Sequence, residues 1–328
     1  MSTPSSTLPN TTSSSEVRTR PTVFIDGEAG TTGLEIRQLL AEVAGIDVRS
    51  ISADKRKDAR ARQELMRDVD LVVLCLPDAA AVEAVALADA LGASAPKIVD
   101  ASTAHRVAQG WTYGFPELDA EQGRAIATAR RVTNPGCYPT GAIALIRPLV
   151  TAGLLPADHP ITVNAVSGYS GGGKAMIEAY ESGKAPLFEL YGLGLAHKHV
   201  PELQQYGKLT RRPIFVPSVA NYLKGMLVSV PLHLDMLPGK PTARDLEAAL
   251  RAHYADATWV TVLGGDDASL QSGRIDALGV NDTNQLELRV FANETYRQAV
   301  LVARLDNLGK GASGAAVQNI RLMLGVEN

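Results

Sequence analysis

A glycine-rich loop between a predicted strand and a predicted helix constrains the fold of this chain more than any other feature. Residues 22–25 are β-branched or aromatic, and the loop Gly27-Glu-Ala-Gly-Thr-Thr-Gly33 follows them. Apolar residues then recur at near-helical spacing from Leu34 to Val43. Strand, glycine loop and helix form the opening unit of dinucleotide-binding domains, whose loop N–H groups and helix N-terminus bind a pyrophosphate. The spacing is G-x-x-G-x-x-G instead of G-x-G-x-x-G, so a tight turn without a ligand is the alternative.

The next segments repeat the alternation of strand and helix. Residues 47–52, 71–76 and 97–100 are strand-like, and an alanine-rich helix is predicted from Pro77 to about Gly92. The fully apolar run 71–76 suits a parallel sheet that is buried on both faces. This alternation predicts an α/β fold with a Rossmann-type parallel sheet, in which ligands bind at the carboxyl ends of the strands.

Basic residues follow the second predicted strand. An NAD site would place an acidic residue there for the ribose 2′-hydroxyl, but this chain has Ser52 and then Lys55-Arg56-Lys57. Because cations bind a phosphate better than a hydroxyl, we interpret Ser52, Lys55 and Arg56 as a site for the 2′-phosphate of NADP. A solvated basic helix start is the alternative.

The strand at residues 97–100 ends in the run Asp100-Ala-Ser-Thr-Ala-His-Arg106. Its position at the end of a parallel strand predicts that this run lines the cleft. Arg106 is therefore a candidate for binding an anion through two hydrogen bonds. An arginine on an ordinary surface loop is the alternative.

Cys137 is the candidate nucleophile. It lies in the run Asn134-Pro-Gly-Cys-Tyr-Pro-Thr140, directly before an apolar helical pattern. The unpaired N–H groups and the dipole at a helix N-terminus favour the thiolate, which is the nucleophilic form. A buried structural cysteine is the alternative. The other cysteine, Cys75, lies in the apolar strand pattern and is interpreted as a core residue.

His197 and His199 flank Lys198 and are followed by Val200-Pro-Glu202. A cysteine nucleophile usually needs an acid/base partner, and histidine titrates nearest to neutral pH. The His-x-His spacing would also suit zinc, but no third ligand is evident, so no metal is predicted. A dinucleotide domain, an activated cysteine and a histidine together indicate reduction of an acyl phosphate to an aldehyde through a thioester.

The second half of the chain has a different pattern. Predicted strands outnumber predicted helices there, and the strands include residues 161–166, 225–232, 274–280, 285–292 and 298–306. Such a pattern predicts an α+β domain with a mostly antiparallel sheet. A last helix at about 311–324 follows the final strand, and its return to the first domain would leave the second domain as an insertion.

Composition sets the remaining bounds. The chain has 328 residues, a net charge of −3 and no long basic run, so no nucleic-acid partner is predicted. No apolar stretch approaches the roughly 20 residues of a membrane span, so no membrane partner is predicted. The two cysteines, which have dissimilar surroundings, suit a reducing cytoplasm. Residues 1–20 are rich in Ser, Thr and Pro and are predicted to be a disordered tail.

Four motifs in order resemble those of a known family. These are the glycine loop, the run NPGCYPTGA, the run HKHVPE and the terminal run NLGKGASGAAVQN. From about residue 22 to residue 325 the chain resembles the short-form branch of N-acetyl-γ-glutamyl-phosphate reductase of arginine biosynthesis. That family reduces N-acetyl-γ-glutamyl phosphate to N-acetylglutamate 5-semialdehyde with NADPH and releases phosphate. Its fold is similar to those of aspartate-semialdehyde dehydrogenase and glyceraldehyde-3-phosphate dehydrogenase.

The resemblance implies two domains with separate functions. Residues 21–136 with 307–328 would form the NADP-binding domain, and residues 137–306 would form an inserted domain for catalysis and oligomerisation. A homodimer or homotetramer is expected on the same ground. In the cleft, Cys137 would accept the acyl group and His199 would act as acid/base. His197 would contact substrate or take the place of His199.

The resemblance also implies binding residues. Those expected to bind cofactor are Gly27, Gly30, Thr31, Thr32, Gly33, Pro77 and Asn319. Those expected to bind the acyl-phosphate substrate are Ser102, Arg106, Glu117, Ser167 and Gly168. Ser102 and Arg106 would hold the phosphate, while Glu117 belongs to the run Tyr113-Gly-Phe-Pro-Glu117.

Other functions remain open at this point. The substrate of a sister enzyme in lysine synthesis, N-acetyl-α-aminoadipyl phosphate, differs by one methylene, which a pocket discriminates by only about 10–200-fold. An aspartate-semialdehyde dehydrogenase is less compatible, because its cysteine lies in a different local run. A non-catalytic NADP-binding regulator is the alternative from another class.

Overall fold

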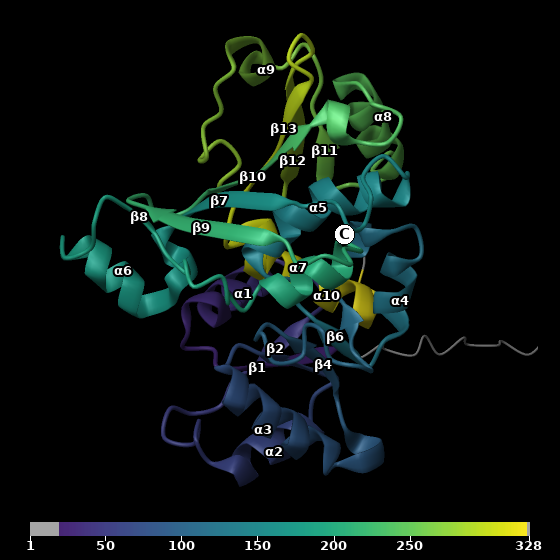
Figure 1. The fold of residues 1–328 in the computed structure, drawn as a ribbon. Coiled ribbons are helices and arrows are strands. Elements are labelled where there is room, and N and C mark those ends of the chain that lie inside the picture. The colour runs from purple at the N-terminus through teal and green to yellow at the C-terminus, as the bar shows by residue number, and fades with distance from the viewer. Residues whose placement is uncertain (1–19, 327–328) are drawn as a thin grey trace, which may run out of the picture.

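The computed structural model describes residues 20–326. The predicted disordered tail at residues 1–20 lies outside the described residues except for Arg20. Two β-sheets dominate the described chain, with helices packed around and between them (Figure 1).

The first sheet is parallel throughout and has the order β2-β1-β3-β4-β6-β5. Its strands are β1 (Thr22–Asp26), β2 (Asp47–Arg49), β3 (Leu71–Leu74), β4 (Lys97–Asp100), β5 (Thr112–Tyr113) and β6 (Arg131–Thr133). Because all these strands run in one direction, their carboxyl ends meet at one edge of the sheet. The loops after β1, β2, β3 and β4 therefore converge on the same edge.

Helices cover both faces of this sheet. They are α1 (Thr31–Ala41), α2 (Ala59–Arg67), α3 (Asp78–Asp89), α4 (Gln122–Thr128) and α10 (Gly314–Leu324). In β1 the pleat divides the core, because Val23 and Ile25 pack with α1, α4 and α10, while Phe24 packs with α2 and α3. The last helix of the chain thus returns to the first sheet, after the second sheet is complete.

The second sheet is mixed and mostly antiparallel, with the order β11-β12-β13-β10-β7-β9-β8. The pairs β7/β9 and β11/β12 are parallel. The strands are β7 (Thr162–Gly168), β8 (Phe188–Leu190), β9 (Ile214–Ala220), β10 (Met226–His233), β11 (Val260–Val262), β12 (Leu286–Asn293) and β13 (Gln298–Leu305). Its core is continuous with the apolar side of α5 (Cys137–Thr151), nearly all of which is buried.

The remaining helices pack around this sheet or project from it. They are α6 (Gly173–Glu181), α7 (Val200–Tyr206), α8 (Ala243–His253) and α9 (Ala268–Ser272). A π-helical turn, η5 (Gly309–Ser313), joins β13 to α10 and packs against α5. Figure 1 shows α5, α7 and α10 gathered where the two sheets approach each other.

The predicted fold class is confirmed: a Rossmann-type parallel sheet and a second, mixed sheet with mostly antiparallel pairs. The strand predicted at residues 274–280 is wrong, because this segment forms a turn. Arg304 Nη1 donates a hydrogen bond to the Asp276 carbonyl there, so a side chain and not a neighbouring strand binds this backbone group. The short strands β5, β6 and β8 were not predicted, since two or three residues show no periodicity.

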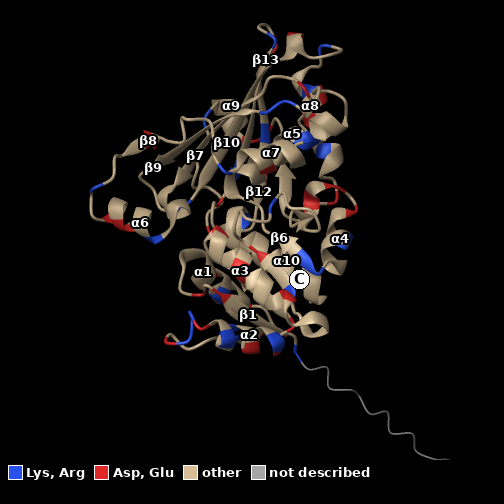
Figure 2. Cartoon of the chain, turned by 60° about the horizontal axis from the view of Figure 1, so that its bottom comes forward, with Lys and Arg blue, Asp and Glu red and all other residues tan. Residues whose placement is uncertain are grey.

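No helix within residues 20–326 is long and apolar enough to cross a membrane. Acidic and basic segments are interspersed over the ribbon (Figure 2). The view agrees with the small net charge of −3.

Candidate active site

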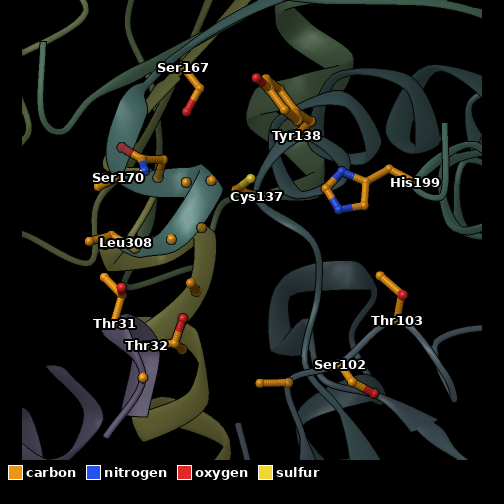
Figure 3. Close-up of a pocket in the computed structure, with 18 of the residues that line it drawn as sticks. Thr31, Thr32, Ser102, Thr103, Cys137, Tyr138, Ser167, Ser170, His199 and Leu308 are labelled. Carbon is orange, nitrogen blue, oxygen red and sulfur yellow. Dashed lines mark hydrogen bonds between the residues drawn. The ribbon is translucent and has the colours of Figure 1, made fainter. Parts of the chain in front are cut away.

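A cleft of about 790 Å³ brings the separated sequence motifs together. The glycine loop, the ends of β3 and β4, the start of α5 and the His197–His199 run all contribute to its lining. Figure 3 shows Thr31 and Thr32 on one wall, Ser102 and Thr103 on another, and Cys137 between them. The cleft also lies at the carboxyl edge of the parallel sheet, where such folds bind their ligands.

The glycine loop has the backbone that a bound phosphate requires. Gly27 has φ +92°, and a Cβ there would lie 2.2 Å from the Cys75 carbonyl oxygen, so only glycine fits. A Cβ on Gly33 would lie 2.6 Å from the Gly27 carbonyl oxygen. Gly30 is the N-cap of α1 and no side chain caps the helix, which leaves first-turn N–H groups facing the cleft. Gly30, Thr31, Thr32 and Gly33 line the cleft, whereas Gly27 shapes the loop behind it.

The other predicted cofactor residues lie in three different settings. Pro77 lines the cleft at the end of β3. Ser52, Lys55 and Arg56 are exposed in the turn after β2, beyond the lining of the cleft. Asn319 is fully buried and donates hydrogen bonds to the Gly114 carbonyl and to Asn134 Oδ1. Asn319 therefore supports the run that precedes Cys137 and does not face the cleft.

Cys137 is the first residue of α5, as the sequence predicted, and its sulfur lies in the cleft. Burial nevertheless raises the pKa of the thiol to about 11, although Arg106 and the N–H groups of Tyr138 and Cys137 act in the opposite direction. The N–H groups at the helix start thus favour the thiolate, as expected, but they do not outweigh burial in the protein without ligand. The cost of desolvating a charge exceeds the stabilisation that the helix end provides.

Cys75 is only partly a core residue. It is half-buried, packs against the core of the first sheet, and also lines the cleft near Pro77. Burial, with Asp100 and Asp26, raises the pKa of Cys75 to about 12. Both cysteines are free thiols.

His199 is the histidine that faces Cys137. It is the N-cap of α7, and Figure 3 shows its imidazole turned toward the sulfur across the cleft. A Cβ on Gly136 would lie 2.9 Å from His199 Nε2, so this nitrogen lies beside the start of α5. Burial and the charges of Arg106, His197 and Lys198 hold the pKa of His199 well below its usual value. The imidazole is therefore neutral at pH 7 and can accept a proton.

His197 lies on the same wall of the cleft, with its ring centroid 4.7 Å from that of His199. Its Nδ1 accepts a hydrogen bond of 3.1 Å from the His199 backbone N–H. The pKa of His197 is lowered by burial and by Lys198 and Arg106. His197 thus packs against His199 and fixes the backbone that carries it.

The Asp100–Arg106 loop is shaped by a buried carboxylate. Asp100 accepts hydrogen bonds from the backbone N–H and the hydroxyl of Ser102, and it pairs with His105 Nδ1 at 2.5 Å. Ser102 and Arg106 line the cleft, as predicted for an anion site. Arg106 is buried and already paired, because its Nη1 donates to Glu202 Oε2 at 3.0 Å.

Ser167 and Gly168, at the end of β7, also line the cleft. Glu117 does not line it. The Glu117 carboxylate accepts hydrogen bonds from Lys310 Nζ at 2.7 and 2.9 Å and from Gln318, so it ties the η2 turn (Pro116–Leu118) to η5 and α10. We therefore leave Glu117 out of the proposed substrate site.

The sequence did not indicate several residues in and beside the cleft. Glu202 lies behind the lining, and its only signal in the motif HKHVPE is a carboxylate in the first turn of a short helix. Tyr138, Ser170, Tyr191, Lys198 and Asn307 line the cleft. Their contribution depends on contacts between distant segments, such as the 2.8 Å hydrogen bond from Asn307 Nδ2 to Ser170 Oγ. Within residues 20–326, no group of three or more His, Cys, Asp or Glu is arranged to hold a metal ion.

Comparisons with known proteins agree with this arrangement. Residues 22–126 match the family model of the semialdehyde dehydrogenase NAD binding domain, and residues 137–307 match that of the semialdehyde dehydrogenase dimerisation domain. The N-acetyl-gamma-glutamyl-phosphate reductase of Mesorhizobium japonicum is 53% identical over 310 residues, which are 94% of this chain and 100% of that protein. N-acetyl-gamma-glutamyl-phosphate reductase 2 of Pseudomonas putida is 50% identical over 308 residues, 93% of this chain and 97% of that protein.

Solved structures show the same fold at low identity. Aspartate semialdehyde dehydrogenase from Francisella tularensis has a TM-score of 0.71 at 14% identity, covering 92% of this chain and 99% of that one. The enzyme from Candida albicans, solved with NADP, has a TM-score of 0.65 at 11% identity, covering 94% and 100%.

Proposed function

This chain belongs to the N-acetyl-gamma-glutamyl-phosphate reductase family of oxidoreductases, and from that premise we propose how it works. It reduces N-acetyl-γ-glutamyl phosphate to N-acetylglutamate 5-semialdehyde, releases phosphate, and takes the hydride from NADPH. The step belongs to arginine biosynthesis. One observation carries the proposal: a single cleft is lined by the glycine loop, by Cys137 and by His199.

The residues at the glycine loop fit a nicotinamide dinucleotide. The free N–H groups at the start of α1 can bind a pyrophosphate, and the lack of a Cβ at Gly33 lets the helix start pack closely on the Gly27 and Glu28 backbone. Thr31 and Thr32 add hydroxyl groups on the same wall. When bound there, the cofactor supplies the hydride that reduces the acyl group.

The protein's own residues prepare the thiol. At rest Cys137 is protonated, because burial raises its pKa to about 11. The neutral imidazole of His199 takes the proton as the sulfur attacks the acyl carbon of the acyl phosphate. Phosphate leaves, and a thioester forms on Cys137. After reduction, His199 returns the proton and the C–S bond breaks to release the aldehyde.

The cleft also stabilises the charges of the substrate. No side chain caps the start of α5, and we propose that the N–H groups of Cys137 and Tyr138 hydrogen-bond the oxyanion that develops at the acyl carbon. We propose that Ser102 and Arg106 hold the transferred phosphate, and that Ser167 and Gly168 contact the rest of the substrate. His197 keeps His199 in place through its backbone.

The division of the chain follows the two sheets. We propose that residues 21–136 with 307–328 bind the cofactor, and that residues 137–306 carry catalysis and subunit contacts. Exposed apolar side chains cluster at and after the edge strand β8, including Leu187, Phe188 and Leu193, and a second copy would cover them in a homodimer or homotetramer.

Light scattering after size exclusion should return a mass of at least two chains, and a single-chain mass at micromolar concentration would refute the proposed oligomer. The cytoplasmic location stays a prediction.

Replacement of the nucleophile tests the mechanism. Cys137→Ser should abolish reduction, because a serine hydroxyl is a far weaker nucleophile than a cysteine thiol. Binding of NADPH should stay unchanged. The assay is phosphate-dependent NADP reduction with N-acetylglutamate 5-semialdehyde, run beside the aminoadipate homologue to determine the chain length of the substrate. Cys75→Ser is the matched control and should keep turnover. A Cys137→Ser enzyme with near-normal rate would refute the assignment.

The two histidines can be distinguished in the same assay. His199→Asn should lower kcat by about 10²–10⁴-fold, the usual range for lost acid/base catalysis. His197→Asn should cost less, because His197 acts on His199 only through packing and one backbone hydrogen bond. If His197→Asn alone lowered the rate to this extent, the roles of the two histidines would be reversed.

We propose that the exposed turn after β2 selects NADPH over NADH. β1 and β2 are adjacent and parallel, so Ser52, Lys55 and Arg56 follow a strand end beside the glycine loop. Lys55→Ala with Arg56→Ala should raise KM for NADPH about 10-fold or more and leave KM for NADH within about twofold, since only NADPH carries the 2′-phosphate. Comparable use of NADH and NADPH by the unmodified enzyme would contradict the assignment.

A further inference from the structure

The Glu202 side chain accepts three hydrogen bonds beside the cleft, and the mechanism above gives it no role. It lies in the first turn of α7 and is 1% exposed. Its Oε1 accepts hydrogen bonds from the Gly136 N–H at 2.7 Å and from the Tyr113 hydroxyl at 2.6 Å. Its Oε2 accepts the hydrogen bond from Arg106 Nη1. One carboxylate on α7 therefore binds three residues that lie between 66 and 96 positions earlier in the sequence.

These contacts fix the groups beside the nucleophile. Gly136 is the N-cap of α5 and immediately precedes Cys137, so the hydrogen bond from its N–H to Glu202 holds the backbone at the start of the helix. A Cβ on Gly136 would lie 2.5 Å from Arg106 Nη1, 2.9 Å from His199 Nε2 and 3.0 Å from Glu202 Oε2. The guanidinium, the imidazole and the carboxylate therefore pack directly on the backbone at the start of α5.

The charge of Glu202 acts on the same sulfur. Arg106 lowers the pKa of Cys137 and Glu202 raises it, and both effects are smaller than that of burial. The other titratable groups around the sulfur are His199, Tyr138 and Tyr191. Lys310, in the η5 turn that packs on α5, is bound by Glu117 and Gln318. Arg106 and Glu202 are thus the two charged side chains that shift the pKa of the Cys137 thiol.

We propose that Glu202 is a positioning residue of the reduction, which holds Arg106 and the Gly136 N–H in place beside Cys137 and offsets the charge of Arg106 at the thiol. This inference rests on the proposed function. The offset adds to the effect of burial, which keeps the thiol protonated until substrate is bound and His199 takes the proton. The hydrogen bonds keep Arg106 aligned for an anion that arrives at the cleft.

Two substitutions separate the effect of the side-chain length of Glu202 from the effect of its charge. Glu202→Gln keeps the length and one acceptor oxygen for Gly136 and Tyr113, but it removes the charge and turns an N–H donor toward Arg106. Arg106 stays nearby, because Nη2 donates to the Ala101 carbonyl at 3.3 Å. Glu202→Asp keeps the charge but shortens the side chain. Glu117→Gln is the matched control, a buried carboxylate paired with Lys310 outside the cleft.

The experiment measures alkylation of Cys137 by iodoacetamide against pH, by mass spectrometry of its peptide, together with kcat and KM. Glu202→Gln should move the alkylation midpoint down by about one pH unit, because a neighbouring negative charge is removed. Its kcat should fall about 10–100-fold as the reacting groups lose alignment, with KM within about threefold. Glu202→Asp should keep the midpoint and lose kcat. Glu117→Gln should keep the midpoint, and the Cys75 peptide should be unaffected in every variant.

An unshifted midpoint in folded Glu202→Gln, or a kcat within about threefold of the unmodified enzyme, would overturn the proposal. An equal shift in Glu117→Gln would do so as well. If Glu202→Gln does not fold, Glu202→Asp decides, and a normal kcat there overturns the proposal. Alkylation does not depend on turnover, so failure of the proposed function would instead appear as activity in Cys137→Ser.

Discussion

The close packing of polar side chains around Gly136 is the constraint on which the rest of the site depends. The backbone before Cys137 has no room for a Cβ, because Arg106, His199 and Glu202 occupy that space. Arg106 follows β4, whereas His199 and Glu202 lie at the start of α7, and all three are buried. The Glu202 carboxylate bonds the backbone N–H and the guanidinium at once. The start of α5 is thus fixed by polar contacts on one side and by the core of the second sheet on the other.

Burial determines the chemistry at this point more than the helix dipole does. A helix N-terminus favours a thiolate, but the desolvation of Cys137 raises the pKa to about 11. The same burial, with the nearby charges of Arg106 and Lys198, keeps His199 neutral. The protonated thiol is thus the proton donor and the neutral imidazole the proton acceptor before the reaction. The site is therefore arranged to form the thiolate during attack, and to keep the sulfur unreactive before it.

Local patterns predicted the fold class and the ends of the elements that bear chemistry. Gly27 to Gly33 and Cys137 could be placed from sequence, because a strand, a turn and a helix start are properties of neighbouring residues. The partners of Arg106 could not, since Glu202 is 96 residues away and only the fold brings them together. Glu117 was assigned to substrate from its motif, but a distant lysine binds it. The pKa of Cys137 was likewise beyond prediction, because burial is a property of the folded chain.

The central claim is that the Cys137 sulfur forms a covalent acyl adduct. The most direct test incubates the enzyme with N-acetyl-γ-glutamyl phosphate and no dinucleotide, then measures phosphate release and analyses both cysteine peptides by mass spectrometry. The account predicts stoichiometric phosphate release and an acyl group on Cys137, with Cys75 unmodified and the adduct lost when NADPH is added. Turnover by an enzyme that never carries an acyl group on Cys137 would contradict it.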